Sequence, residues 1–301
     1  MKDKLYKIMI PLFLLVFLAG CGSTQDAEKT DNKVDKRVAV VASFNAMAEL
    51  TKAIGGDKIE LTTIVPSGVE AHDFEPKPRD IASLSKASLF IYNGLGMEPW
   101  AKDMLKSIDN KNLEIIEAFK EADLIKNSGE EIGEHGEFDP HVWLSLKEAK
   151  VQANSIKEGL IKVDSNNKDY YESNYKEFSK KIDDLKAEYE KKITSLERKD
   201  LVTGHAAFAY LCRDFGIQQH SVEDVFAEGE PTSQKIKELI DLSKKIKIKT
   251  VFMEENASPK VSETIAKEVG AKVDTINTLE SEGDYINTMK ENLEKIYNSL
   301  T

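Results

Sequence analysis

Residues 37–66 read RVAVVASFNAMAELTKAIGGDKIELTTIVP, and this stretch decides the fold. Its first run, RVAVVAS, is short, β-branched and apolar on both faces, which predicts a buried strand. The next run, NAMAELTKAIGG, predicts a helix that ends at Gly55 and Gly56, and IELTTIVP predicts a second strand. A strand, a helix and a strand in this order form a βα unit around a mainly parallel sheet.

The same alternation continues along the chain and falls into two halves. In the first half it is carried by KPRDIASLSKA, SLFIYNG, EPWAKDMLKSI and LEIIEA, and it starts again with DLVTG at Asp200. We therefore predict an α/β protein with two βα-type lobes, each built on a mainly parallel sheet. The N-terminal lobe covers 37–166 and the C-terminal lobe covers 198–301.

A long helix is predicted between the lobes, at 167–197. This segment contains no Gly or Pro, and its apolar residues recur every three or four positions, as on one face of a helix. A coiled-coil partner helix is the alternative, but a stripe this aromatic favours a rigid spanning helix that packs on the protein's own lobes. The stripe consists of Tyr171, Tyr175, Phe178, Ile182 and Leu185.

The N-terminus differs in character from the rest of the chain. Three lysines precede the apolar run IMIPLFLLVFLAG, which Pro11 interrupts and which is too short for a stable membrane span. The run ends in LAGC, which resembles a bacterial lipoprotein signal and implies lipid (palmitate) attachment to Cys21. We expect a signal peptide at 1–20 and a polar, lipidated tether at 21–36. An ordinary secretion signal or a true membrane span are the alternatives.

Charge and cysteine content narrow the classes of function. The formal net charge of the chain is −11, and removing the signal peptide would make it more negative. An acidic chain argues against a nucleic-acid partner and is compatible with cation capture. Besides Cys21, the sequence contains only Cys212, so we expect no internal disulfide and assign Cys212 to the core.

Three of the five histidines occupy loops that follow a strand or enter a helix. His72 lies in PSGVEAHDFEPKPRD, His141 in FDPHVWLSL and His205 directly after DLVTG. Each alone could be a structural or surface residue, but ligands bind at this edge of open α/β sheets. Neutral imidazoles are common ligands of zinc, and a carboxylate would complete a tetrahedral site.

Several motifs in order carry a family resemblance: GVEAHDFEP, DPHVWLS, TGHAAFAYL, FAEGEPTSQKIKELI, VFMEENASPKVSETIAKEVGAKV and LES. Over 37–299 the chain resembles the metal-binding lipoproteins of bacterial zinc and manganese ABC importers, the cluster 9 solute-binding proteins. The resemblance implies a metal site in the cleft between the lobes. The implied ligands are His72, His141, His205 and Glu280.

The third and fourth positions indicate which metal is bound. Manganese-type members carry glutamate where this chain has His205, and an aspartate near the last strand where this chain has Glu280 in LES. Asp274 and Asp284 are less favoured as the fourth ligand. Three imidazoles and one carboxylate favour Zn²⁺ over Mn²⁺, because harder ions prefer more oxygen ligands.

Other residues near these motifs have weaker assignments. His135 lies in the acidic loop NSGEEIGEHGEFDPH, either as part of a solvated loop or as an accessory residue for metal capture. Trp143 is expected to pack beneath the His141 loop, and His220 to be an ordinary strand-end residue. Glu254 and Glu255 end a strand at the ligand edge and could accept hydrogen bonds from a ligand histidine.

The resemblance implies a zinc receptor on the extracellular face of a cell membrane of Gram-positive type. It would be lipid-anchored and monomeric, and would deliver Zn²⁺ to an ABC permease driven by an ATPase subunit, with small loop shifts releasing the metal. Four protein ligands would close the metal site, so we predict no catalysis. The alternatives are a manganese receptor, a zinc-dependent hydrolase with Glu255 as its base, and a surface adhesin.

Overall fold

The structure is a computed structural model of the 301-residue chain, and it describes residues 37–127, 136–225, 231–255 and 257–301. Contacts group Lys36–Thr301 into one compact unit. The predicted signal peptide (1–20), the tether with Cys21 (21–36) and His135 lie outside the described residues.

The first lobe contains a parallel sheet within residues 37–127, formed by β1 (Val38–Ala42), β2 (Ile59–Thr63), β3 (Leu89–Tyr92) and β4 (Glu114–Glu117). The strand order is β2-β1-β3-β4. All four residues of β3 are buried, as its apolar sequence on both faces predicts. The helices that connect and cover the sheet are α1 (Asn45–Gly55), α2 (Pro78–Leu84), α3 (Ala101–Lys106) and α5 (Leu146–Val163).

The second lobe repeats this architecture in the described part of 200–301. Its parallel strands are β5 (Asp200–Thr203), β6 (Gln218–Ser221), β7 (Thr250–Glu254) and β8 (Lys272–Ile276). Their order is β6-β5-β7-β8, the same pattern as in the first lobe. The helices are α7 (Ala209–Phe215), α8 (Ser233–Ile246), α9 (Pro259–Val269) and α10 (Tyr285–Leu300).

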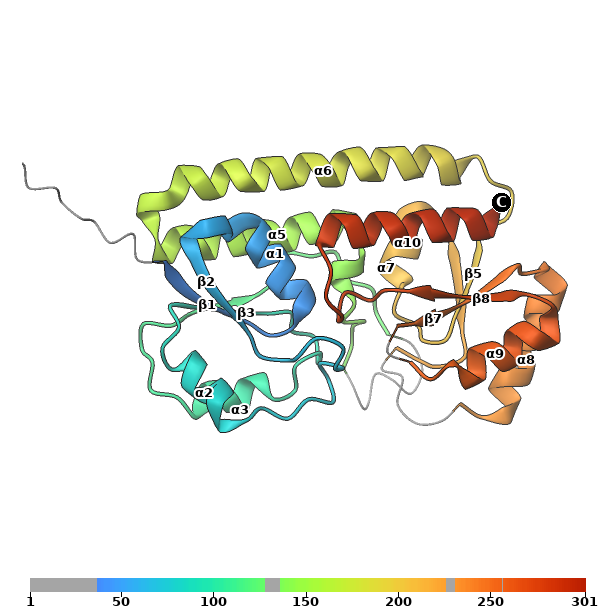
Figure 1. Ribbon diagram of the computed structural model, residues 1–301, viewed down its shortest axis with the longest axis horizontal. Coiled ribbons are helices and arrows are strands. Elements are labelled where there is room, and N and C mark those ends of the chain that lie inside the picture. The colour runs from blue at the N-terminus through green and yellow to red at the C-terminus, as the bar shows by residue number, and fades with distance from the viewer. Residues whose placement is uncertain (1–36, 128–135, 226–230, 256) are drawn as a thin grey trace, which may run out of the picture. The chain divides into compact units, whose positions relative to one another are not determined.

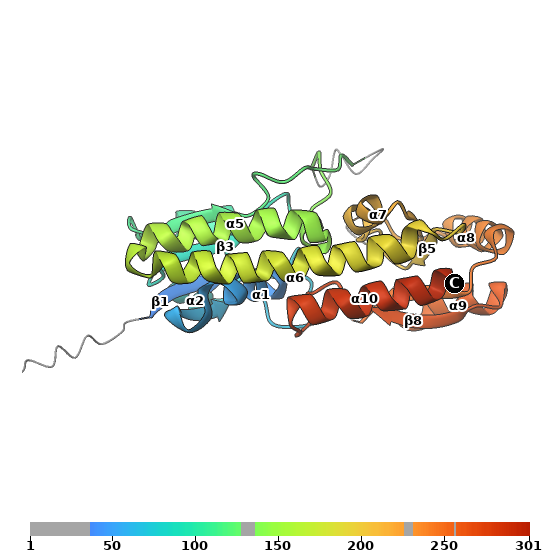
Figure 2. The same cartoon turned by 90° about the horizontal axis from the view of Figure 1, so that it is seen from above.

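The long helix α6 (Lys168–Thr194) contacts α1 and α5 of the first lobe and α7 and α10 of the second (Figures 1 and 2). It begins and ends close to the predicted 167–197 and extends over about 40 Å. The residues of the predicted stripe are buried, except Tyr175, which is half-buried. The Lys157 Nζ lies 4.7 Å from the centroid of the Tyr175 ring. The buried face also includes Tyr189 and Ile193.

One continuous hydrophobic core extends through both lobes and includes Leu89, Trp143, Phe178 and Leu293. The predicted fold class is thus confirmed, whereas the lobe boundaries at 166/167 and 197/198 stay predictions. Cys212 is a buried free thiol, as expected. None of the helices in the described ranges combines the length and the apolar character that crossing a bilayer requires.

Candidate metal centre

His141 lies at the entrance to α5 and is held by Asp139. The Asp139 carboxylate accepts a hydrogen bond from the backbone N–H of His141 (2.8 Å) and another from its Nδ1–H (2.9 Å). Both side chains are buried. Because Nδ1 carries the proton, Nε2 keeps its lone pair, and a carboxylate behind an imidazole orients it as a metal ligand.

His205 follows β5 by two residues, and its ring centroid lies 5.0 Å from that of His141. Its Nε2–H donates to the carbonyl oxygen of Val225 at 2.6 Å. The pKa of His205 is lowered to about 3, mainly by burial and also by the neighbouring His141 and His72, while the bond to Val225 opposes this shift. The imidazole is therefore neutral, as metal binding requires.

His72 lies on the loop after β2, close enough to His205 to affect its pKa. Its Nδ1 is 3.8 Å from a Glu70 carboxylate oxygen and its Nε2 is 4.0 Å from one of Asp73. Trp100 holds the backbone next to it, since its Nε1–H donates to the carbonyl oxygen of Ala71 at 3.1 Å. His72 thus lies near His205 but is contributed by the first lobe.

Glu280 follows β8, and only 3% of the residue is exposed to solvent. Thr278 donates from its hydroxyl to Oε2 at 2.9 Å, while Oε1 is buried without a partner among the residues described. Burial, together with the charge of Glu70, raises the pKa of Glu280 to about 8. A buried carboxylate oxygen without a donor is costly, and a bound cation would remove that cost.

Glu254, at the end of β7, is a second buried carboxylate near the histidines. Its Oε1 accepts the backbone N–H of His205 at 3.3 Å, its Oε2 has no partner within the described ranges, and burial raises its pKa to about 7. Glu254 thus accepts a hydrogen bond from a predicted ligand histidine, as expected, although the donor is the backbone of His205 and not its ring. Glu255 differs from the expectation, because it is exposed and accepts its hydrogen bond from Asn277.

The four predicted ligands are brought into one region but are not yet assembled into a metal site. In the part of the chain that the structure describes, no three His, Cys, Asp or Glu side chains are close enough together to hold an ion. With Nε2 of His205 bonded to Val225, the lone pair of that ring lies on Nδ1. Binding through Nε2 would first break the bond to Val225.

The remaining predicted residues have structural roles. Trp143 is fully buried and donates from Nε1 to the carbonyl oxygen of Thr278 at 2.7 Å, as its predicted packing role requires. His220 bonds Asp200 at 2.9 Å within the second sheet. The sequence interpretation missed Asp139, although its position two residues before His141 in DPH was a usable signal.

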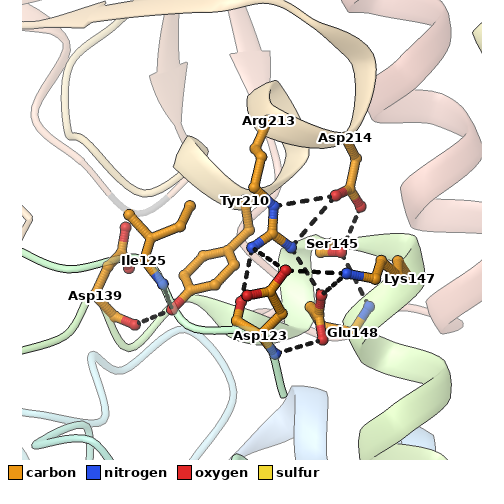
Figure 3. A network of polar contacts seen from close by, with 9 residues as sticks. All are labelled: Asp123, Ile125, Asp139, Ser145, Lys147, Glu148, Tyr210, Arg213 and Asp214. Atoms are coloured by element: carbon orange, nitrogen blue, oxygen red, sulfur yellow. Dashed lines mark hydrogen bonds and ion pairs between the residues drawn. The ribbon is translucent and has the colours of Figure 1, made fainter.

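Helix α7 of the second lobe fastens the segment that precedes His141 (Figure 3). The Tyr210 hydroxyl donates to the carbonyl oxygen of Asp139 (2.7 Å) and accepts the backbone N–H of Ile125 (3.1 Å). One turn further, Arg213 donates to the buried carboxylate of Glu148 at 2.8 Å. The second lobe therefore helps to position a histidine of the first.

Fold and site together define a two-lobed α/β protein with a histidine-rich candidate metal centre between its lobes. Residues 40–299 match the family described as zinc-uptake complex component A, periplasmic. The high-affinity zinc uptake system protein ZnuA of Bacillus subtilis is 38% identical over 310 residues, which cover 97% of this chain and 96% of that protein. The chain belongs to this zinc-uptake family, which comprises solute-binding receptors and not enzymes.

Two further relatives show the range of the family. The manganese ABC transporter substrate-binding lipoprotein PsaA of Streptococcus mitis is 31% identical over 311 residues, covering 99% of both chains. The structure of the laminin-binding protein Lmb of Streptococcus agalactiae is described as that of a bifunctional protein with adhesin and metal transporting activity. It matches with a TM-score of 0.80 at 34% identity, covering 88% of this chain and 100% of that one. These matches confirm the resemblance found in the sequence.

Proposed function

We propose that this protein is the zinc-capturing receptor of an ABC-type metal importer. The observation that carries the proposal is the ring contact between His141 and His205, whose centroids lie 5.0 Å apart. Each lobe contributes one of these two rings. Asp139 holds His141 so that its Nε2 is free to bind, and His205 is neutral. One Zn²⁺ would be bound by His72, His141, His205 and Glu280.

The donor set supports zinc over manganese. Three imidazole nitrogens and a single carboxylate suit Zn²⁺, whereas Mn²⁺ favours a larger share of oxygen ligands. The manganese-named relative shows that metal preference varies among similar proteins. Position 205 decides between the two, because glutamate there would supply a second carboxylate.

Capture, not catalysis, is the proposed activity of this site. Four protein ligands complete the tetrahedral sphere of zinc, whereas a catalytic zinc keeps a position for water or substrate. Glu255, the base required by a hydrolase, is exposed and bonded to Asn277. The carboxylate of Glu255 is therefore engaged with Asn277 and not with a histidine of the proposed site.

Delivery and anchoring complete the proposal. Lipidation of Cys21, after removal of 1–20, would tether the protein through 21–36 to the outer face of the membrane. The monomeric receptor would pass Zn²⁺ to a permease driven by its ATPase.

The lobes are proposed at 37–166 and 198–301, with the connecting helix at 167–197. Adhesion, ascribed to the S. agalactiae relative, could coexist with transport and would be tested by binding to laminin.

A metal competition experiment tests this function. The purified protein, stripped of metal, is dialysed against equimolar Zn²⁺ and Mn²⁺, and its bound metal is measured. Wild type should retain zinc, and His205→Glu should shift the preference towards manganese. His220→Glu is the matched control, because His220 bonds Asp200 within the second sheet. Manganese retained by wild type would refute the zinc assignment, and failure to bind either metal would refute the function.

A further inference from the structure

The loop after β8 carries Glu280, and a residue of the first lobe holds it on both sides. Asn45, the first residue of α1, donates from Nδ2 to the carbonyl oxygens of Leu279 (3.1 Å) and Ser281 (2.6 Å). A primary amide has two N–H donors, so one side chain bridges the residues that flank Glu280. Leu279 has a φ of 65°, a left-handed conformation that a non-glycine residue adopts when its surroundings impose it.

The loop after β2 adds bonds to the same segment. The backbone N–H of Gly68 donates to the carbonyl oxygen of Glu280 at 3.1 Å, and that of Glu282 donates to the Ser67 hydroxyl at 2.8 Å. Glu280 therefore belongs to the second lobe by sequence but is fastened to the first by hydrogen bonds.

Asn45 is well placed to act as the fixed end of this connection. It opens a helix whose buried residues, among them Met47 and Leu50, pack into the common core. A clamp mounted on a rigid element orders the Glu280 loop before metal arrives, so the entropy cost of ordering does not fall on metal binding.

We propose that Asn45 is a positioning residue for metal binding, which acts by clamping the backbone on both sides of Glu280. This inference rests on the proposed function, in which Glu280 is a ligand. Asn45 itself does not contact the metal. Its removal should therefore affect metal binding only while Glu280 is there to bind.

A double-mutant cycle tests this dependence. The full-length protein in detergent is stripped of metal, and zinc affinity and dissociation rate are measured by chelator competition. Asn45→Ala should accelerate zinc release about 10-fold or more in the wild-type background. In the Glu280→Gln background, the same substitution should have almost no effect, because the clamp no longer positions a ligand.

Two further variants separate positioning from general effects. Asn45→Asp keeps the side-chain volume and adds a negative charge. Simple electrostatics predicts tighter zinc binding for it, whereas loss of the amide donors predicts weaker binding. Asn110→Ala is the matched control, since Asn110 Nδ2 also bridges two carbonyl oxygens, those of Leu84 (3.4 Å) and Ala87 (2.8 Å), within the first lobe. It should leave zinc release unchanged.

Each outcome has a defined meaning. Weaker binding by Asn45→Ala and Asn45→Asp, both dependent on Glu280, supports the clamp. An equal loss in both backgrounds, no loss at all, or tighter binding by Asn45→Asp overturns it while the zinc-receptor function stands. If wild type binds no zinc, the proposed function fails first and the clamp fails with it.

Discussion

The carboxylate of Asp139 fixes the orientation of the His141 ring, and in the proposed site it would determine how that ring binds the metal ion. It is buried and accepts two hydrogen bonds from His141, one from the backbone and one from Nδ1. Asp139→Asn keeps the shape of the side chain but removes the charged oxygen that accepts the Nδ1–H of His141. We expect zinc affinity to fall about 10- to 100-fold, measured by competition with a chelator of known affinity.

A half-buried carboxylate far from the histidines in the sequence provides the control for that prediction. Asp164 accepts the hydroxyl of Tyr171 and the amide of Asn167 at the turn between α5 and α6, each at 2.7 Å. Asp164→Asn should lower thermal stability without changing zinc affinity. An equal loss of affinity in both variants would show that Asp139 acts only through stability.

The buried carboxyl of Glu280 makes the metal-free protein sensitive to pH. Its pKa rises from 4.5 to about 8, mainly by burial, so between these pH values the folded state holds a proton that the unfolded state has lost. Stability therefore falls as pH rises across this window. Glu280→Gln removes the effect, and we expect it to stabilise the metal-free protein at pH 8 by at least ~1 kcal/mol, but not near pH 4.5.

Thermal unfolding of chelator-treated protein at both pH values checks this sign. Glu282→Gln, at an exposed carboxylate two residues away, should retain the wild-type pH dependence. With zinc present, stability should instead rise with pH, because zinc would bind the ionised Glu280 carboxylate and the affinity for zinc would rise with pH. A constant stability difference between wild type and Glu280→Gln across the window would contradict the explanation.

At the scale of elements, α7 joins the lobes through Arg213. Its guanidinium donates to Glu148 at 2.8 Å and to the carbonyl oxygen of Asp123 at 2.7 Å (Figure 3). The Glu148 side chain is only 1% exposed, and Lys147 at 3.1 Å also balances its charge. We expect Arg213→Met to lower the free energy of unfolding by about 2 kcal/mol, the loss of one hydrogen bond to a charged group.

Chemical denaturation measures the loss of stability in Arg213→Met, and a variant of an exposed ion pair serves as the reference. Lys180 and Asp184 pair on the surface of α6 with side chains 74% and 65% exposed, so Lys180→Met should cost less than about 0.5 kcal/mol. Adding Glu148→Gln to Arg213→Met should recover part of the stability, because the buried charge is removed as well. Failure to recover any stability would mean that the charge on Glu148 is not the cause.

The sequence predicts elements better than it predicts the contacts between them. The buried strands and the Tyr171 stripe follow from hydrophobic periodicity, which is local. The three histidines were found because each lies at a strand end or helix entrance. The bond from Asn45 to Ser281 spans 236 positions and has no periodic signal. For the same reason, the sequence does not indicate that Glu254 is buried while the adjacent Glu255 is exposed.

At the scale of the whole molecule, α6 limits how far the lobes can move. It packs on α1 and α5 of one lobe and on α7 and α10 of the other, and a continuous core extends beneath it. A helix of 27 residues without a break bends little, since sharp kinks need a proline or a comparable defect. Metal binding should therefore change side chains and loops near His205 and Glu280 more than it changes the lobe arrangement.

Small-angle X-ray scattering tests that limit on lobe movement. With and without zinc, the radius of gyration of wild type should differ by less than about 1 Å, the scale of a pre-organised binding site. Lys181→Pro, at an exposed position in the middle of α6, should break the helix and allow a larger zinc-dependent change. Lys181→Ala removes the same charge but keeps the helix, so it should behave as wild type. A zinc-induced decrease of more than about 2 Å in wild type would show that the lobes close as hinged bodies despite α6.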